Sequence, residues 1–405
     1  MPELAVAPVE IAGRDAAAEE AKWLLPVYAQ LPVEPVRGEG VKLWTRDGRE
    51  LLDFYGGHAV ALLGYGHPRL LAALSAQAET MFFQSNLVPL EIRARAAQAL
   101  VSFAPPGLSR AFLVNSGAEA NENALRLAIR QTGRERVIAL KGSFHGRTAA
   151  AAAVTWGAEE WAGFPSNPFE VEFVPAGDLD ALERALAPRG ETDAGVAALI
   201  LEPVQGMAGA VDLGAAYLSG ARELTRNAGA LLIFDEVQCG MGRTGQPFAA
   251  QLYGVTPDLL TTAKGLAGGF PAAAVMVSDA AAAGLKKGDL GTTFGGGPLA
   301  CALIEATIGA ILEEDLLGNV RRLSARLKAE CVGGVVTGVQ GEGFLLGLRC
   351  ARPAKDVQAE LLARGLMTGT SADPAVLRLL PPLVLKDAHV DALVSALSEL
   401  PGAAG

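Results

Sequence analysis

One stretch decides the fold class of this chain: Ala230-Leu-Leu-Ile-Phe-Asp-Glu-Val-Gln238. Five apolar residues in a row lead into two carboxylates, and such an unbroken run is typical of a strand buried on both faces of a parallel sheet. Similar short runs recur around it, so we expect further strands at 111–115, 136–140, 171–175, 197–201 and 273–277. Helical patterns lie between them, at 118–131, 179–187 and 215–227. This alternation predicts an α/β fold with a mostly parallel central sheet.

The pattern changes toward both ends of the chain. Residues 41–48 and 50–54 read as a hairpin with an Asp-Gly turn. After about residue 295, long amphipathic helices lead to a predicted strand at 341–348. A chain of 405 residues is also long for a single core. We therefore expect a large domain at 61–290 and a smaller α+β domain assembled from 1–60 and 291–405.

Composition excludes several classes of protein. The net charge of −10 argues against a nucleic-acid or anionic-membrane partner. No signal peptide is evident at the start, and no apolar run is long enough to span a bilayer. The four cysteines lack CxxC spacing, which argues against a zinc site or a disulfide framework. We expect a soluble, cytoplasmic protein without a metal centre.

The first candidate site is Asn115-Ser-Gly-Ala-Glu-Ala-Asn121, between a predicted strand and a predicted helix. Its small residues would let backbone N–H groups at the helix N-terminus close around a phosphate. A tight turn capped by Ser116 is at least as good an interpretation of the motif alone. The motif matches neither a Walker loop nor GxGxxG, which disfavours a nucleotide.

The second candidate is the carboxylate pair Asp235 and Glu236 at the end of the apolar run. Ligands of α/β proteins bind at this edge of the sheet, and buried carboxylates need partners there. The protonated ring nitrogen of a pyridine cofactor, a magnesium ion or the amides of the following loop would each serve. This segment alone leaves the three alternatives open.

The third candidate is Lys264, which follows the apolar run after Asp258 and precedes the glycine-rich stretch 265–271. Such surroundings would place its amine in a cleft, where desolvation favours a nucleophilic, imine-forming lysine. Most lysines are instead solvated at the surface. The small and apolar neighbours favour the cleft.

The three candidates in this order, with several further motifs, resemble the class III, or ω-type, aminotransferases of the fold-type I pyridoxal-phosphate enzymes. The similarity extends over essentially the whole chain. The matching stretches are 115–121, Phe144-His-Gly-Arg147, Glu202-Pro-Val-Gln-Gly206, Asp235-Glu-Val-Gln238, Gly240-Met-Gly-Arg-Thr-Gly245, Lys264 and Gly291-Thr-Thr-Phe-Gly-Gly296. The resemblance implies a large domain with a mostly parallel sheet, a smaller domain from both chain ends, and pyridoxal 5'-phosphate as cofactor.

The resemblance also implies roles for the candidate cofactor residues. Lys264 would form the covalent link to the cofactor and later move the substrate proton. Asp235 would pair with the ring nitrogen, Gln238 with the phenolic oxygen, and Phe144 would stack on the ring. Glu202 would support the residues that contact the cofactor and would not act as a catalyst itself. The phosphate would be held by Ser116, Gly117 and Ala118, and by Thr293 of a neighbouring subunit in a homodimer.

Within the family, Phe-His-Gly-Arg and Gly-Thr-Thr-Phe-Gly-Gly are most similar to acetylornithine aminotransferases. Arg147 would then bind the distal carboxylate of the substrate, and Arg378 the α-carboxylate of glutamate. Tyr28 and Thr292 would also contact the substrate. The implied reaction transfers a terminal amine to 2-oxoglutarate, giving a semialdehyde and glutamate, in arginine biosynthesis.

Two positions depart from the family pattern. Met207 stands where related enzymes have a glutamate that masks the arginine equivalent to Arg378. An unpaired buried guanidinium costs several kcal/mol, so we expect Arg378 to be masked by another carboxylate or left in solvent. Gly297 stands where the family commonly has asparagine.

Three other functions stay open on the sequence. The same site serves lysine biosynthesis on a semialdehyde linked to a small acidic carrier protein. Such a carrier needs a basic docking rim, which Arg93, Arg95 or Arg130 could supply. The scaffold also supports pyridoxal-phosphate aminomutases. A non-catalytic binding module is the third alternative, and the lysine–aspartate pair disfavours it.

Overall fold

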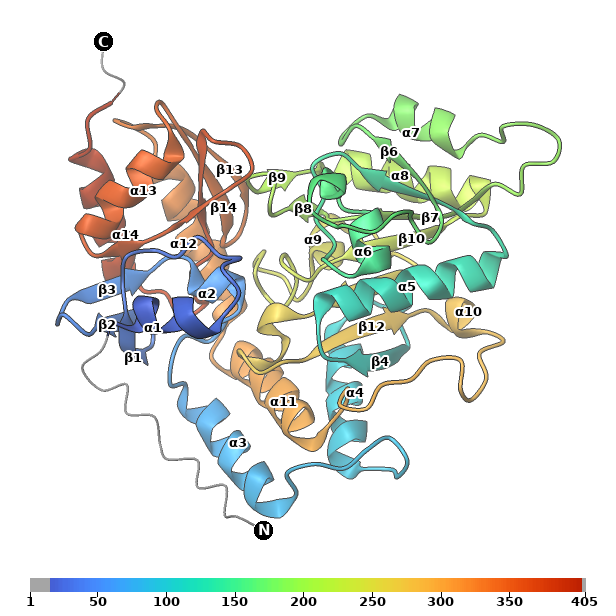
Figure 1. The fold of residues 1–405 in the computed structure, drawn as a ribbon, viewed down its shortest axis with the longest axis horizontal. Coiled ribbons are helices and arrows are strands. Elements are labelled where there is room, and N and C mark those ends of the chain that lie inside the picture. The colour runs from blue at the N-terminus through green and yellow to red at the C-terminus, as the bar shows by residue number, and fades with distance from the viewer. Residues whose placement is uncertain (1–14, 403–405) are drawn as a thin grey trace.

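Within residues 15–402, which the computed structural model describes, seven strands form the central sheet in the order β4-β12-β11-β10-β7-β5-β6 (Figure 1). Their bounds are Arg110–Val114, Ala273–Val277, Leu259–Thr262, Leu231–Asp235, Val196–Leu201, Arg136–Leu140 and Glu170–Val174, in the same order. The pairs from β11 to β6 are parallel, and β12 is antiparallel to both its neighbours. The predicted α/β class with a mostly parallel sheet is confirmed, and β11 is a strand that the apolar pattern did not reveal.

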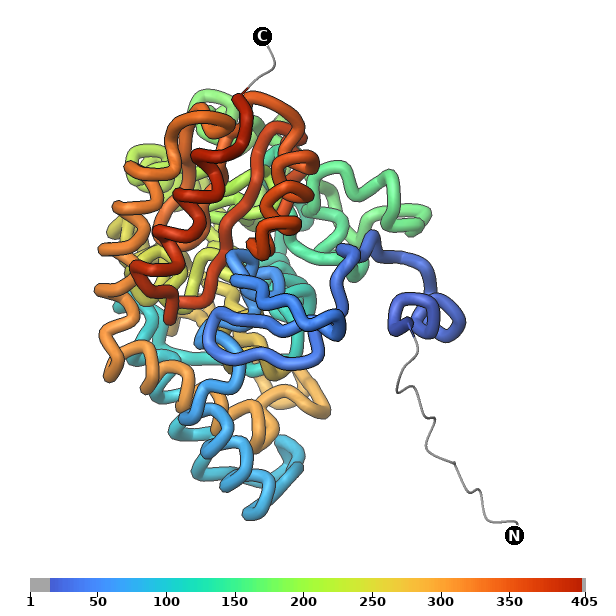
Figure 2. Tube along the Cα trace, turned by 90° about the vertical axis from the view of Figure 1, so that its left-hand side faces the viewer, coloured from blue at the N-terminus to red at the C-terminus, as the bar shows by residue number. Residues whose placement is uncertain are grey.

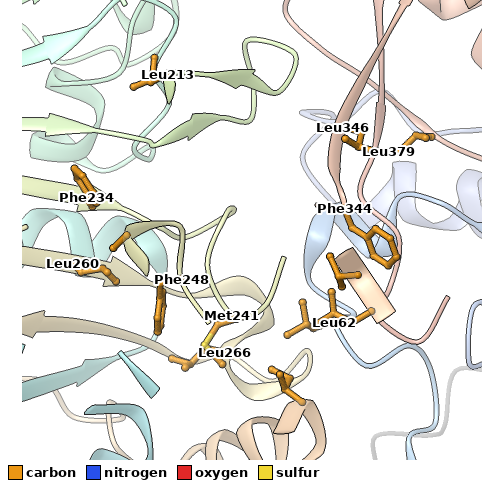
Figure 3. Packing of buried hydrophobic residues seen from close by; sticks show 14 of the residues in the cluster. Leu62, Leu213, Phe234, Met241, Phe248, Leu260, Leu266, Phe344, Leu346 and Leu379 are labelled. Atoms are coloured by element: carbon orange, nitrogen blue, oxygen red, sulfur yellow. The ribbon is translucent and has the colours of Figure 1, made fainter. Parts of the chain in front are cut away.

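The central strand β10 is buried on both faces, which explains its unbroken apolar run. Leu232 and Phe234 belong to one hydrophobic cluster, while Ile233 belongs to the other. Helix α5 (Gly117–Thr132) packs on the second face, and α8 (Gly214–Ala228) with α7 (Leu179–Leu186) covers the first. The first cluster continues from Phe234 to Leu62 and Phe344 in the other half of the molecule (Figure 3). The cavity described below lies beside this continuous core.

Strands from both ends of the chain share one small sheet. The predicted hairpin is present as β2 (Lys42–Thr45) and β3 (Glu50–Asp53), and β15 (Leu366–Met367) pairs with β3. A second four-stranded sheet has the order β13-β14-β17-β16. The remaining strand bounds are β1 Pro35–Glu39, β8 Val204–Gln205, β9 Val211–Asp212, β13 Val336–Glu342, β14 Leu345–Cys350, β16 Gly369–Thr370 and β17 Val376–Leu379.

In chain order, two long helices, α11 and α12, lie between β12 of the central sheet and β13 of the second four-stranded sheet. Helix α11 (Pro298–Glu313) packs against α3, α4 and the short helix η2 (Lys264–Ala267), and Gly297 leaves its N-terminus without a side-chain cap. Figure 2 shows α1 (Ala16–Trp23), which buries no residue, standing away from the rest. The other helices are α2 Gly56–Ala59, α3 Pro68–Thr80, α4 Glu91–Phe103, α6 Ala149–Ala153, η1 Ala158–Glu160, α9 Ala249–Tyr253, α10 Asp279–Ala282, α12 Leu316–Glu330, α13 Ala354–Ala363 and α14 Asp387–Ser398. Across residues 15–402, none of the helices is long and apolar enough to cross a membrane.

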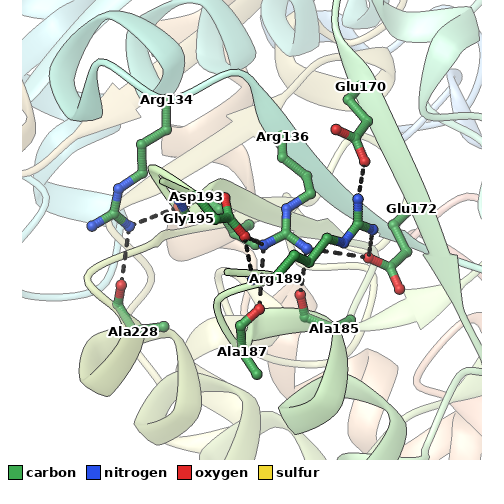
Figure 4. Close-up of polar contacts among 11 residues, drawn as sticks. Arg134, Arg136, Glu170, Glu172, Ala185, Ala187, Arg189, Asp193, Gly195 and Ala228 are labelled. Atoms are coloured by element: carbon green, nitrogen blue, oxygen red, sulfur yellow. Dashed lines mark hydrogen bonds and ion pairs between the residues drawn. The ribbon is translucent and has the colours of Figure 1, made fainter. Parts of the chain in front are cut away.

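A buried arginine ties the sheet to the loop after α7. Arg136 of β5 is 4% exposed and donates to Asp193 at 2.9 Å and to the carbonyl of Ala185 at 3.1 Å (Figure 4). Buried charges of this kind are stable only with such partners. The cluster lies at the start of β5, at the end of the strand away from Phe144, and its role is structural.

Candidate active site

A cavity of about 430 Å³ lies where the strands of the central sheet end. Such an edge is the usual ligand site of an open α/β sheet. Residues at or after the ends of β4, β5, β7, β10 and β11 line it, together with His58 and Val60 of the segment after β3. The sequence-predicted residues that the structure brings together here are Ser116, Gly117, Ala118, Phe144, Arg147, Asp235, Gln238 and Lys264.

The N-terminus of α5 forms one wall of the cavity. Ser116 caps the helix by accepting a hydrogen bond from the Glu119 amide at 3.2 Å. The first amides of a helix have no partner inside it, so those of Gly117 and Ala118 are left to bind an anion. A side chain at Gly117 would approach the methyl groups of Val237 to 3.0 Å. The cap and the phosphate cradle are therefore compatible interpretations of one motif.

Asp235 is held in a buried hydrogen-bond network at the end of β10. Its Oδ2 accepts from Asn121 Nδ2 and from His145 Nδ1, each at 2.7 Å, and its Oδ1 accepts from the Val237 amide at 3.0 Å. Asn121 is itself fixed by the hydroxyl of Thr261, at 2.7 Å. Asn121 and His145 stand inside two motifs of the sequence, but nothing in their spacing revealed that they meet at Asp235.

Glu236 points away from Asp235 and has a structural role. Its two carboxylate oxygens accept from the amides of Ala249 and Ala250, at 2.5 and 2.8 Å, at the start of α9. Burial raises the pKa of Glu236 to about 7. A magnesium site that uses both carboxylates is therefore excluded by geometry, and the capping alternative holds for Glu236.

Lys264 begins the short helix η2 directly after β11, and its side chain reaches the cavity. Its φ of 46° lies in the left-handed region, which is strained for a lysine and is found mostly at functional sites. Burial lowers the pKa of Lys264, against the opposing attraction of Asp235 and Glu202. A lowered pKa favours the neutral, nucleophilic amine.

Gln238 and Phe144 complete the cavity wall. Within residues 15–402, the buried Oε1 of Gln238 has no hydrogen-bond partner. Since the two ends of an amide exchange by a 180° rotation, this side chain can present N–H to a ligand oxygen. The loop of Phe144 is held by Glu202, which accepts from its amide at 2.9 Å and from that of Gly206 at 3.1 Å. Burial, aided by Asp235, raises the pKa of Glu202 to about 7.

These residues fit pyridoxal phosphate. The free amides of α5 suit its phosphate, the network-held Asp235 suits its ring nitrogen, and the unpartnered Gln238 suits its phenolic oxygen. Lys264 supplies the amine for its aldehyde. Each group of the cofactor thus has a matching group on the chain.

The two predicted substrate arginines lie in different surroundings. Arg147 is exposed and lines the cavity, with its guanidinium carbon 4.5 Å from the Trp161 ring centre. Arg378 is 2% exposed and does not line the cavity. Its guanidinium donates to the carbonyls of Thr370 at 2.7 Å and Gly206 at 3.2 Å, and to the Tyr55 hydroxyl at 3.0 Å. The expectation of a masking carboxylate or of solvent around Arg378 is wrong, because neutral oxygens surround this guanidinium.

Three other predicted residues lie outside the cavity of this single chain. Tyr28 is 86% exposed. Thr292 caps its own turn, accepting from the Gly295 amide at 3.1 Å, and lies 3.4 Å from Asn115 Nδ2. Thr293 is exposed to solvent. None of the three lines the cavity of this chain, and of them Tyr28 and Thr293 are exposed.

Comparison with known proteins agrees with the geometry. Residues 26–400 match the family model described as aminotransferase class-III. The acetylornithine aminotransferase of Methanopyrus kandleri is 42% identical, with 94% of this chain and 96% of that protein covered. The succinylornithine transaminase/acetylornithine aminotransferase of Pseudomonas aeruginosa is 40% identical over 91% of this chain and 93% of that protein.

Solved structures give the same result. The crystal structure of the ornithine aminotransferase from Toxoplasma gondii ME49 superposes with a TM-score of 0.87 at 31% identity, covering 95% of this chain and 93% of that one. An (S)-enantioselective omega-transaminase from Thermomicrobium roseum superposes with a TM-score of 0.86 at 28% identity, covering 95% and 98%. The chain therefore belongs to the class-III aminotransferases, which depend on pyridoxal phosphate.

Proposed function

We propose that this protein transfers the terminal amine of an N-acylated ornithine to 2-oxoglutarate, giving a semialdehyde and glutamate, as a step of arginine biosynthesis. One observation carries the proposal: Lys264 and Asp235 share a cavity with two guanidinium groups nearby, and neither Arg147 nor Arg378 pairs with a carboxylate of residues 15–402. Two uncompensated cations suit a partner that brings two carboxylates, as 2-oxoglutarate does. The curated relatives named acetylornithine aminotransferase support the choice of donor.

The chain supplies the groups that this reaction needs. When bound, pyridoxal phosphate withdraws electrons from the amine-bearing carbon of the substrate. Lys264 would hold the cofactor through its amine, and the same amine would move the proton at that carbon. Asp235, held by Asn121 and His145, stabilises a proton on the ring nitrogen. Arg147 orients the distal carboxylate, and Arg378 binds the α-carboxylate of glutamate.

The proposed active unit is a homodimer. Phe82, Phe83 and Phe294 form an exposed aromatic patch, with the rings of Phe83 and Phe294 5.4 Å apart. Exposed apolar patches of this kind mark subunit interfaces. Thr293 directly precedes Phe294, is exposed and does not line the cavity of its own chain, which fits a role at the phosphate of the partner subunit. The shared sheet of β3 and β15 supports domain boundaries near residues 60 and 290.

A carrier-linked substrate is less well supported. Arg95 pairs with Glu91 at 2.6 Å, and Arg130 pairs with Asp289 at 2.8 Å. Arg93 donates to backbone carbonyls of its own chain. The three arginines that could have formed a basic docking rim are thus engaged, and we prefer a free amine donor.

The four cysteines are free thiols, which supports the cytoplasm as the location of the protein.

The test combines chemical trapping with half-reactions. Borohydride reduction of the holoenzyme, followed by peptide mapping, is expected to label Lys264. The Lys264→Ala variant should lose the label, and Lys286→Ala, which removes an exposed lysine, should keep it. N-acetylornithine or N-succinylornithine should change the cofactor absorbance, and 2-oxoglutarate should restore it. A label on another residue, or no spectral response to either donor, would refute the proposal.

A further inference from the structure

The turn Gly56–Ala59 has an unusual backbone. All four residues have positive φ, with values of 57°, 55°, 65° and 65°. Left-handed backbone costs roughly 1–2 kcal/mol for each residue other than glycine, and His58 and Ala59 both adopt it. The carboxylate of Asp53 holds the entrance of the turn, accepting from the amides of Tyr55 at 2.7 Å and Gly56 at 2.8 Å. Strain maintained in this way points to a function for the side chain that it presents.

The turn places His58 between the cavity and Arg378. His58 lines the cavity, as do Met207 and Lys264, whereas Tyr55 and Arg378 do not. The Nδ1 of His58 lies 2.6 Å from the Tyr55 hydroxyl, which in turn lies 3.0 Å from Nη2 of Arg378. The rings of Tyr55 and His58 meet edge to face, with centres 5.2 Å apart.

The direction of these hydrogen bonds follows from Arg378. A guanidinium can only donate, so the Tyr55 oxygen accepts from it, and this leaves the Tyr55 hydroxyl proton to donate to Nδ1 when the His58 ring is neutral and carries its proton on Nε2. Burial, together with the charges of Lys264 and Arg378, lowers the pKa of His58 to about 4, which agrees with a neutral ring. The whole chain of contacts is uncharged apart from Arg378 itself.

Arg378 therefore keeps its full charge behind a neutral layer. Three of its five N–H groups donate to neutral oxygens, and two remain for a ligand. Arg378 does not line the cavity, so a carboxylate that arrives from there has to move the Tyr55 hydroxyl or His58 aside before it reaches these two N–H groups. A substrate that engages Arg147 alone leaves all these contacts in place.

We propose that Tyr55 and His58 form a neutral cover over Arg378, and that this cover sets how tightly the site binds a second carboxylate. The inference deepens the proposed function and rests on it. It assigns a specificity role to two residues of the N-terminal part. It distinguishes dicarboxylates such as glutamate and 2-oxoglutarate, which must open the cover, from ω-amine donors, which do not.

The test measures binding of glutarate, an unreactive dicarboxylate, to the holoenzyme by calorimetry. Tyr55→Phe removes the hydroxyl that glutarate has to displace, so glutarate should bind roughly tenfold tighter, the size expected for one hydrogen bond to a charged group. The apparent Kd of glutamate in its half-reaction should fall in parallel. The half-reaction of N-acetylornithine should change by less than about twofold, because its carboxylate binds at Arg147.

Two further variants separate the cover from a general loss of structure. His58→Ala removes the acceptor of the Tyr55 hydroxyl and should act like Tyr55→Phe. His58→Asn keeps an acceptor oxygen and tolerates left-handed backbone, so it should restore wild-type binding. Tyr217→Phe is the matched control, because the buried hydroxyl of Tyr217 has no partner within residues 15–402. This control should leave both half-reactions unchanged.

Two results would contradict the proposed cover. The first is an unchanged glutarate affinity in both Tyr55→Phe and His58→Ala, and the second is weaker glutarate binding in Tyr55→Phe. The second would make the hydroxyl part of the carboxylate site itself. Failure of the proposed function is a separate result, in which wild-type holoenzyme gives no half-reaction with glutamate. If Tyr55→Phe does not fold, the comparison of His58→Ala with His58→Asn decides.

Discussion

His145 and Asp235 lie 2.7 Å apart, from Nδ1 to Oδ2, although 90 residues separate them along the chain. Asn121 donates to the same oxygen, also at 2.7 Å. Two N–H donors on one oxygen fix the plane of the carboxylate, so that the geometry of Asp235 does not depend on a bound ligand. Orientation of this kind is what a charge that must face a ring nitrogen requires.

Replacing His145 tests this support. His145→Leu removes a hydrogen bond to a charged group and should lower kcat by roughly 10- to 100-fold. His145→Asn can still donate an N–H and should retain most of the activity. Steady-state kinetics with cofactor-saturated enzyme measure both variants. Equal kcat values in the two variants would show that the imidazole only fills space.

A methyl group at position 206 should disturb the cofactor site through Gln238. The Cβ of Gly206→Ala would collide with Oε1 of Gln238 and force this side chain away from its present position. Pyridoxal phosphate should then bind roughly tenfold more weakly, as expected for the loss of one hydrogen bond to a charged oxygen. Equilibrium dialysis measures the affinity. Gly338→Ala, whose Cβ would meet open space, is the matched control, and an equal effect in both would contradict the contact.

Trp161 should position Arg147 for the distal carboxylate. The guanidinium of Arg147 stacks on the Trp161 ring at 4.5 Å, a contact worth about 0.5–2 kcal/mol. Trp161→Ala should therefore raise the KM of donor and acceptor together, by about fivefold, with kcat unchanged. Trp44→Ala breaks a similar stack with Arg37, at 4.0 Å on the surface, and should leave both KM values unchanged. A fall in kcat alone would place Trp161 in another role.

The stability of the protein should fall as pH rises from about 4.5 to about 7, and Glu236 is one cause. Burial raises the pKa of Glu236 from its ordinary value of 4.5 to about 7 in the folded state. The protonated form is therefore favoured by folding, and its contribution is complete below pH 4.5 and lost as pH rises through 7. The contribution corresponds to about 3 kcal/mol. Urea denaturation at several pH values measures the slope.

The Glu236→Gln variant should lack this part of the pH dependence, because an amide does not ionise. It should still accept a hydrogen bond at the start of α9 through its carbonyl oxygen. Glu223→Gln, on the exposed face of α8, is the control and should keep the wild-type slope. A wild-type slope in Glu236→Gln would assign the effect to other buried carboxylates.

Much of the fold could be read from the sequence, because buried parallel strands and caps are local patterns. Six strands follow from short, mostly apolar runs, and the N-terminus of α5 follows from Ser116. Strand β11 was not among the expected strands, because the run after Asp258 has only two strongly apolar residues before Thr261 and Thr262. The hydroxyl of Thr261 is buried only because it donates to Asn121, a contact that no local pattern encodes.

The sequence by itself placed Asp235 at the end of an apolar strand, where ligands of α/β sheets bind, and the resemblance of its motifs to class III aminotransferases implied the cofactor. Only the tertiary structure decided which of the two adjacent carboxylates, Asp235 or Glu236, faces the cofactor site. Asp235 faces the cavity and Glu236 caps α9, because successive side chains leave a strand on opposite sides. It also decided what covers Arg378. The Tyr55 hydroxyl lies 323 residues away in the chain, and the backbone hydrogen bond between Phe54 and Leu380 holds the segment of Tyr55 beside the end of β17.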